Sequence, residues 1–201
     1  MTKPPMLTAQ QALDHLLSHA QTVNESERVP VQAALGRVLA ENVNSLVDVP
    51  PLDNTSMDGY AVRCADTLAA GQALKVAQRI PAGSVGTQLE PGTAARIFTG
   101  APIPPGADAV VMQEDCIAGE LPDQVIVNVP PTLGQWIRRR GEDLTAGKTA
   151  LIAGSFLRPQ ELGVAASAGL THLNVRRRVR VAAFFTGDEL ALPGEQLEPG
   201  G

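Results

Sequence analysis

Three polar clusters in this sequence carry side chains that could bind a charged ligand, and a fourth polar segment follows an apolar run. They are residues 54–60 (NTSMDGY), 98–102 (FTGAP), 136–143 (WIRRRGED) and 186–189 (TGDE). Arginine guanidinium groups can bind phosphate oxygens in pairs, whereas carboxylates such as Asp58 and Asp143 suit Mg²⁺ or a general base. A site that combined both types could bind a metal-bridged phosphate or another oxyanion.

Each cluster also has a plainer interpretation. Residues 54–60 are typical of a tight, solvent-facing turn, and we interpret Asp53 just before them as a turn-forming residue. The arginines of 136–143 could form a surface salt-bridge strip with Glu142 and Asp143. For residues 186–189 the functional interpretation is favoured, because open α/β sheets bind ligands at the carboxyl ends of their strands.

The composition excludes several classes of protein. The chain has 201 residues, 44% of them hydrophobic, which indicates a folded core rather than disorder. Its formal net charge of −5 argues against nucleic acid as a partner. The two cysteines, Cys64 and Cys116, have no metal-binding spacing, and no apolar segment is long enough for a secretory signal or a membrane span. We therefore expect a cytoplasmic protein with reduced thiols that binds neither nucleic acid nor membrane.

The elements that must position these clusters are short. A Thr8–Gln11 capping box and leucine spacing predict a helix over 8–20, and 31–39 predicts a short helix broken at Gly36. Short β-branched runs predict strands at 75–80, 93–98, 109–113 and 124–129, in a compact barrel or sandwich. Residues 149–157 alternate like a strand, a helix runs from Pro159 to Gly169, and 179–185 (VRVAAFF) predicts a buried parallel strand.

Four ordered motifs carry a resemblance to a known family. DNTSMDGYAVR, RIFTGAPIPPGADAVVMQED, IRRRGED and VRVAAFFTGDEL follow one another along the chain. In this order they closely resemble the molybdopterin molybdenumtransferases of the MoeA type, which also form the C-terminal domain of gephyrin. The resemblance extends from the N-terminal helix to the last residue, and none of the four motifs is a generic pattern.

The resemblance implies an elongated, multi-domain subunit of mixed α/β class that forms a homodimer. Residues 46–146 would be a β-rich domain, inserted into a small discontinuous α/β domain made of 27–45 and 147–177. Residues 178–201 would begin a third, parallel α/β domain that binds molybdopterin, and the helix within 1–26 would pack with it. A C-terminal β barrel is the fourth domain of the family, so the chain looks like the front part of a longer enzyme.

The implied reaction is a step of molybdenum cofactor biosynthesis. Molybdate is inserted into adenylylated molybdopterin and AMP is released, with Mg²⁺ assisting. By the resemblance, Asp58 and Glu189 would be catalytic or metal-binding carboxylates. Thr99, Arg138 and Asp143 would bind substrate, in a cleft between the β-rich domain of one subunit and the third domain of the other.

Two other functions remain open from the sequence. The chain could be a non-catalytic dimerisation or scaffold module of the gephyrin type, or a simple oxyanion-binding β module. In the leading interpretation it is the N-terminal part of a longer transferase, and we expect the 201-residue chain alone to insert no molybdate.

Overall fold

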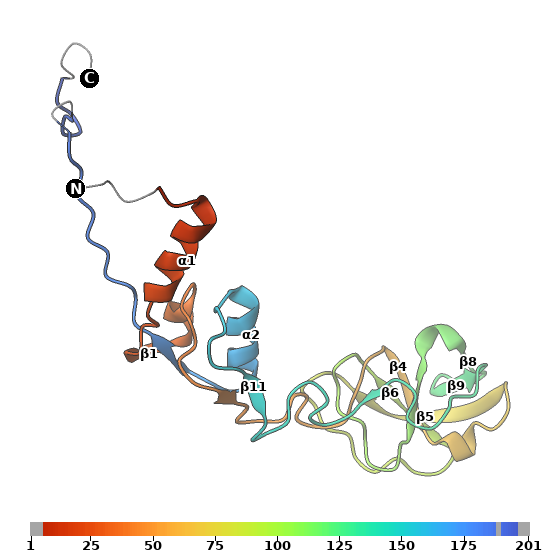
Figure 1. Ribbon diagram of the computed structural model, residues 1–201. Helices are drawn as coiled ribbons and strands as arrows, with labels where there is room; N and C mark the ends of the chain where they lie inside the picture. The colour runs from red at the N-terminus through yellow and green to blue at the C-terminus, as the bar shows by residue number, and fades with distance from the viewer. Residues whose placement is uncertain (1–5, 188–189, 197–201) are drawn as a thin grey trace.

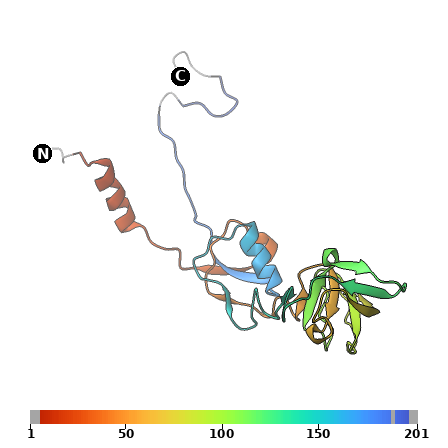
Figure 2. The same cartoon turned by 90° about the vertical axis from the view of Figure 1, so that its right-hand side faces the viewer.

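The computed structural model describes residues 6–187 and 190–196. Its shape is elongated: a β-rich unit lies at one end, a smaller α/β unit lies beside it, and helix α1 (Ala9–His19) stands apart from both (Figures 1 and 2). The chain enters the smaller unit first, leaves it for the β-rich unit, and returns to complete the smaller unit. Among the described residues, no helix is long and apolar enough to cross a membrane.

The β-rich unit contains a six-stranded sheet with the strand order β7-β4-β6-β5-β9-β8. The strands are β4 (Gly59–Val62), β5 (Gln72–Ile80), β6 (Thr93–Ile97), β7 (Ala109–Met112), β8 (Cys116–Ala118) and β9 (Gln124–Val127). The β5–β6 pair is parallel and every other neighbouring pair of this sheet is antiparallel. Two short 3₁₀-helices, η2 (Cys64–Asp66) and η3 (Gln113–Asp115), follow β4 and β7.

Both faces of this sheet are covered by apolar side chains. One cluster contains Ala61, Ile80, Leu89, Ala95, Ile97, Ala101 and Val110, and the other contains Val62, Leu74, Ala94, Ala109, Val111, Val125 and Val127. Successive residues of a strand point to opposite faces, so the central strands contribute to both clusters. This accounts for Ala109, Val110 and Val111 of β7, which are all buried, and for Ala94 and Ala95 of β6, which are buried on opposite faces of the sheet.

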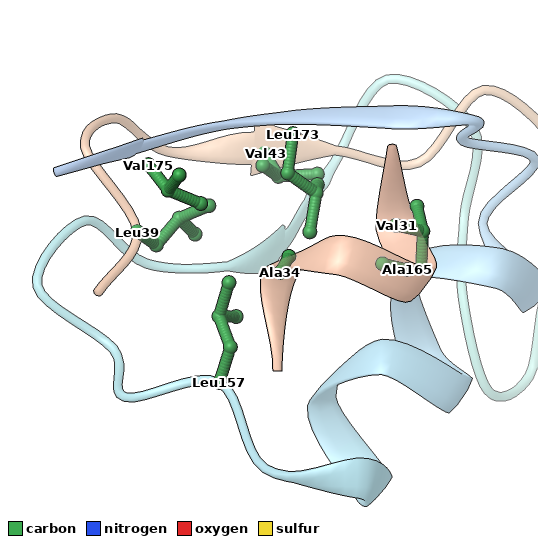
Figure 3. Packing of buried hydrophobic residues seen from close by; sticks show 8 residues of the cluster. All are labelled: Val31, Ala34, Leu39, Val43, Leu157, Ala165, Leu173 and Val175. Carbon is green, nitrogen blue, oxygen red and sulfur yellow. The ribbon is translucent and has the colours of Figure 1, made fainter. Parts of the chain in front are cut away.

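The smaller unit joins segments that are far apart in the sequence. Strands β1 (Ser26–Pro30) and β12 (His172–Arg176) pair antiparallel, as do β2 (Val43–Asn44) and β11 (Thr149–Leu151). The 3₁₀-helix η1 (Val31–Ala34) and helix α2 (Pro159–Ser167) cover them. Their side chains meet in one core, shown in Figure 3, whose buried members are Val31, Ala34, Leu39, Val43, Leu157, Ala165, Leu173 and Val175.

Helix α1 forms for local reasons. The Thr8 hydroxyl accepts from the Gln11 amide, and the Gln11 side chain accepts from the Thr8 amide, which completes the predicted capping box. None of its residues is buried, and its leucines at 13, 16 and 17 remain exposed. Its amphipathic pattern therefore has no packing partner among the described residues.

Most of the elements predicted from the sequence are confirmed. The helix at 8–20, the helix that opens at Pro159 and the four β-branched strands form within a few residues of their predicted ends. The segment at 31–39 forms one 3₁₀ turn, and Gly36 takes a positive φ of 70° just after it. The predicted strands at 93–98 and 109–113 form β6 and β7, which lie on either side of β4 in the sheet.

The strand predicted for residues 179–185 is wrong in this structure. These residues form no strand, and Val181, Phe184 and Phe185 are more than four-fifths exposed. A buried strand needs hydrogen-bonded neighbours on its edges, and no described strand lies beside this segment to provide them. The last strand of the smaller unit is β12, which pairs with β1. The sequence analysis did not predict this pair.

Candidate functional site

The turn that carries Asp58 is fixed by Thr55, a buried residue three positions earlier in the chain. Thr55, in β3 (Asn54–Thr55), is only 1% exposed. Its hydroxyl donates to the Met57 carbonyl at 2.7 Å and accepts from the Met57 amide at 3.1 Å. A threonine hydroxyl that bonds the backbone two residues further on closes a turn locally. The chain therefore reaches Asp58 in a defined conformation, and Gly59 then begins β4.

Three segments of the predicted site meet at this turn. The Thr55 amide donates to the Ala101 carbonyl at 3.0 Å, and the Gly100 amide donates to the Thr55 carbonyl at 2.8 Å. On the other side, β3 pairs with β10 (Ile137–Arg138), and the Ser56 amide donates to the Trp136 carbonyl at 3.0 Å. Clusters 54–60, 98–102 and 136–143 are thus joined through backbone hydrogen bonds.

Asp58 and Thr99 form the first side-chain pair of the site. The Thr99 amide and the Thr99 hydroxyl both donate to Oδ1 of Asp58, each at 2.7 Å. These hydrogen bonds, the amide first, hold the pKa of Asp58 below its ordinary value, and the Arg96 charge adds to the effect. Asp58 is therefore ionised at neutral pH. No described residue donates a hydrogen bond to its second oxygen, Oδ2, which is free to bind a ligand.

Arg138 and Asp143 form the second pair. Arg138 donates from Nη2 to Asp143 at 2.6 Å and from Nε to Glu142 at 3.2 Å. Asp143, and then Glu142, raise the pKa of Arg138 above its ordinary value. The salt-bridge strip considered from the sequence is therefore present. The guanidinium group retains two N–H groups on Nη1 for which no described residue is an acceptor.

Two aspartates, Asp53 and Asp48, accept hydrogen bonds from the arginine segment. The sequence analysis predicted neither of these contacts. Asp53 accepts from the Arg140 amide at 2.8 Å and from Arg139 Nη1 at 2.6 Å. Asp48 accepts from the Ala146 amide at 2.8 Å and from Arg140 Nε at 2.6 Å. The backbone amides of Arg140 and Ala146 are the main reason why the pKa values of Asp53 and Asp48 are lowered. Asp53 thus bridges two segments, rather than acting only as a turn former.

The balance of charge in this segment matters for anion binding. The guanidinium groups of Arg138, Arg139 and Arg140 contact four carboxylates, namely Asp48, Asp53, Glu142 and Asp143. Three cations against four anions leave no excess positive charge at these contacts. An oxyanion that binds Arg138 must therefore use the free Nη1 edge or compete with Glu142 and Asp143.

The donor set around Asp58 fits a magnesium ion only in part. No group of three His, Cys, Asp or Glu side chains able to hold a metal occurs among the described residues. Mg²⁺ commonly keeps several waters and binds through one or two carboxylates together with substrate phosphates. The free Oδ2 of Asp58 fits the role of one such carboxylate ligand. Glu189, the second metal-binding residue implied by the resemblance, lies outside the described residues.

The structure therefore joins four of the five predicted site residues into two pairs. Asp58 contacts Thr99, and Arg138 contacts Asp143. No hydrogen bond or ion pair links one pair directly to the other among the residues that the structure describes. The two pairs are connected through the backbone of Thr55 and Ser56, which bonds to residues 100–101 on one side and to Trp136 on the other.

Sequence comparisons place this architecture in a known family. Residues 7–169 match the model for the MoeA N-terminal region (domain I and II). A molybdopterin molybdenumtransferase 2 of Mycobacterium tuberculosis is 46% identical over 177 residues, which are 86% of this chain and 43% of that protein. A molybdopterin molybdenumtransferase of a Nostoc species is 39% identical over 191 residues, 92% of this chain and 43% of that protein.

Structural comparison agrees. A molybdopterin biosynthesis MoeA protein from Pyrococcus horikoshii superimposes with a TM-score of 0.76 at 37% identity, over 83% of this chain and 45% of that one. The chain therefore belongs to the MoeA family, as its four motifs predicted. It spans less than half the length of these curated relatives.

Proposed function

We propose that this chain is the N-terminal part of a molybdopterin molybdenumtransferase. The enzyme would insert molybdate into adenylylated molybdopterin and release AMP. The observation that carries the proposal is the Asp58–Thr99 pair, held by two 2.7 Å hydrogen bonds at the junction of three family motifs. The names of the curated relatives support the reaction class, and none of them favours the scaffold alternative.

In this proposal Asp58 acts as an ionised carboxylate. Its lowered pKa keeps it charged, and Thr99 fixes Oδ1, which leaves Oδ2 without a hydrogen-bond donor among the described residues. Oδ2 would hold Mg²⁺, which when bound neutralises phosphate charge on the substrate. Thr99 thus positions the carboxylate, and its amide and hydroxyl keep it deprotonated.

Arg138 would contact the oxyanion part of the substrate through its Nη1 edge. Asp143 and Glu142 hold the other edge of the guanidinium group and fix its plane. A planar group fixed in this way loses little side-chain entropy when it binds an anion. Asp143 is therefore a positioning residue for Arg138 in this scheme. Glu189 would be the second catalytic or metal-binding carboxylate, as the resemblance implies.

The domain division and partners expected from the resemblance belong to the same proposal. The β-rich domain would be 46–146, within a small α/β domain of 27–45 and 147–177. Residues 178–201 and the exposed helix α1 would belong with a molybdopterin-binding domain. The enzyme would act as a cytoplasmic homodimer. Light scattering coupled to size-exclusion chromatography measures the oligomeric state, and a monomeric mass for the active enzyme would contradict the dimer.

The direct test uses the open reading frame that contains this sequence. It is expressed in a bacterial strain that lacks its molybdenumtransferase, and a molybdenum-dependent enzyme activity is measured. Wild-type protein is expected to restore the activity and Asp58→Ala to fail, while Glu120→Ala, which removes an exposed carboxylate between β8 and β9, matches wild type. AMP release from adenylylated molybdopterin on addition of molybdate provides the assay in vitro. If the wild-type protein releases no AMP, the proposed reaction is wrong.

A further inference from the structure

Three neighbouring strands bring Arg79, Arg96 and Tyr60 into one row across the six-stranded sheet. Arg79 of β5 is the register partner of Arg96 of β6, and Arg96 is the partner of Tyr60 of β4. Two like charges directly opposite each other on adjacent strands destabilise a sheet unless another group compensates them. The row therefore requires an explanation.

Aromatic rings account for part of the compensation. The Phe98 ring lies 4.6 Å from the guanidinium carbon of Arg79 and 4.5 Å from that of Arg96. The Tyr60 ring lies 5.2 Å from the guanidinium carbon of Arg96. Each contact is within the range of a cation–π interaction. These contacts hold the two cations in place, but the rings carry no negative charge to neutralise them.

The two guanidinium groups have donors to spare. Neither has a carboxylate within 4 Å among the described residues, unlike Arg138, Arg139 and Arg140. Arg96 donates to the Gly59 and Ile97 carbonyls and to the Gln113 amide oxygen. Arg79 donates to no described residue, so all five of its N–H groups are available.

Tyr60, Arg79 and Arg96 line a pocket of about 500 Å³, a size typical of sites for small ligands. Val76, Ile117 and Pro122 provide an apolar wall beside Tyr60 and the arginines. One carboxylate, that of Asp123, also lines the pocket, and Lys75 lies 3.7 Å from it. The pocket thus combines an apolar surface with two cations that have no carboxylate within 4 Å among the described residues.

We propose that this pocket binds a phosphate monoester carried on an apolar or aromatic body. Two guanidinium groups match the two negative charges that a phosphate monoester carries near pH 7. The apolar wall would contact the body of the ligand. The site is separate from the Asp58–Thr99 pair, although Arg96 bonds the carbonyl of Gly59, the residue next to Asp58. The inference does not depend on the proposed transferase reaction.

Phenyl phosphate is a suitable probe, because it has a dianionic head and an aromatic body. Isothermal titration calorimetry of the chain should detect binding of phenyl phosphate, weaker binding of inorganic phosphate and none of phenol. Arg79→Gln should weaken the binding of phenyl phosphate at least about tenfold, since it removes a charged hydrogen-bond donor. Arg28→Gln, which removes an exposed arginine of β1 with no carboxylate partner among the described residues, should leave it unchanged.

Nuclear magnetic resonance locates the bound probe. Addition of phenyl phosphate should shift the backbone amide signals of Tyr60, Arg96 and Cys116 and leave those of β1 and β12 in place. The proposal is overturned if phenyl phosphate does not bind, if Arg79→Gln binds it as tightly as wild type, or if phenol binds equally well. Because these measurements need no molybdopterin, a failed complementation assay would not affect them.

Discussion

Thr99 donates two hydrogen bonds to a single oxygen of Asp58, a residue 41 positions earlier in the chain. One comes from the backbone amide and the other from the hydroxyl, so the two donors respond differently to mutation. The backbone donor survives every substitution of Thr99 that keeps the fold. The hydroxyl donor alone is lost in Thr99→Val.

The first prediction distinguishes the role of the Asp58 carboxylate from that of the Thr99 hydroxyl that bonds to it. We expect Asp58→Asn to reduce kcat about a hundredfold or more, because the substituted amide cannot provide the negative charge. Thr99→Val should reduce it about tenfold, since Asp58 keeps the amide hydrogen bond. Thr99→Ser should keep most of the wild-type activity, because serine retains the hydroxyl donor. Steady-state AMP release measures all three, and a Thr99→Ser variant as impaired as Thr99→Val would refute the positioning role of the hydroxyl.

The second prediction concerns Arg138, which donates to Asp143 and Glu142 from one edge. Lysine cannot reproduce this fork and also present a second edge to a ligand. We expect Arg138→Lys to raise the KM for molybdate or for adenylylated molybdopterin about tenfold or more, with an unchanged melting temperature. Arg158→Lys, at the ion pair between the N-cap residue of α2 and Glu161, is the matched control. Unchanged KM values for both substrates would show that Arg138 does not bind the substrate.

The third prediction tests the close approach of β4 to β7. A Cβ added at Gly59 would collide with the carbonyl oxygen of Val111 in the next strand. We expect Gly59→Ala to lower the free energy of unfolding by about 2 kcal/mol or more, because the colliding atom is backbone and cannot turn away.

Gly163→Ala provides the control for that substitution. Gly163 lies within α2, and a Cβ there would meet no atom within 4 Å. Alanine at this position should stabilise the protein by about 0.5–1 kcal/mol, because it has the higher helix propensity. Chemical denaturation measures both variants. A Gly59→Ala protein as stable as wild type would show that the two strands can separate locally without cost.

Sequence patterns predicted local structure better than long-range pairing. The capping box at Thr8, the helix after Pro159 and the β-branched runs depend on neighbouring residues, and all of them form. The run at 179–185 was read as a buried strand from its apolar composition alone. Burial depends on a partner strand, which is a non-local condition that composition does not contain.

The candidate site shows the same limit. The contact of Arg138 with Asp143 was one of the two interpretations of residues 136–143, as a salt-bridge strip or as an anion-binding group. Asp53 was assigned to a turn, whereas its carboxylate contacts Arg139, 86 positions away. A signal for the Arg79–Arg96 row was present, since Arg96 and Phe98 are two apart in a predicted strand and so share a face. Only the register of β5 against β6 places Arg79 beside them.

The fourth prediction concerns the pH dependence of stability at helix α2. The Arg158 guanidinium group, which donates to Glu161 at 2.5 Å, lowers the pKa of Glu161 from 4.5 to about 2. The unfolded chain therefore binds this proton more readily than the folded one. The contribution of Glu161 is fully present above pH 4.5 and is lost as the pH falls towards 2.

Urea denaturation of wild type and Glu161→Gln between pH 2 and pH 7 measures this contribution. The wild type should be the more stable protein above pH 4.5, and the difference should shrink as the pH falls. Glu120→Gln, which changes an exposed carboxylate near the start of β9, should show no such trend. A difference between wild type and Glu161→Gln that does not vary with pH would contradict the assignment.

The last prediction concerns the two thiols. Burial is the main cause that raises the pKa of both Cys64 and Cys116 from 9.0 to about 11. At pH 8 only about one thiol in a thousand would then be ionised, and the thiolate is the form that reacts with alkylating agents. Iodoacetamide should therefore modify the folded protein far more slowly than the urea-unfolded chain.

The same shift has a consequence for stability at high pH. The unfolded thiols ionise near pH 9 and the folded ones near 11, so the unfolded state is favoured increasingly as the pH rises between these values. Cys64→Ala should lessen this loss of stability, since alanine does not ionise. Cys116 also lines the pocket with Arg79 and Arg96, so bound phenyl phosphate should slow its alkylation further and leave that of Cys64 unchanged. Equal protection of both thiols would instead indicate a general tightening of the fold.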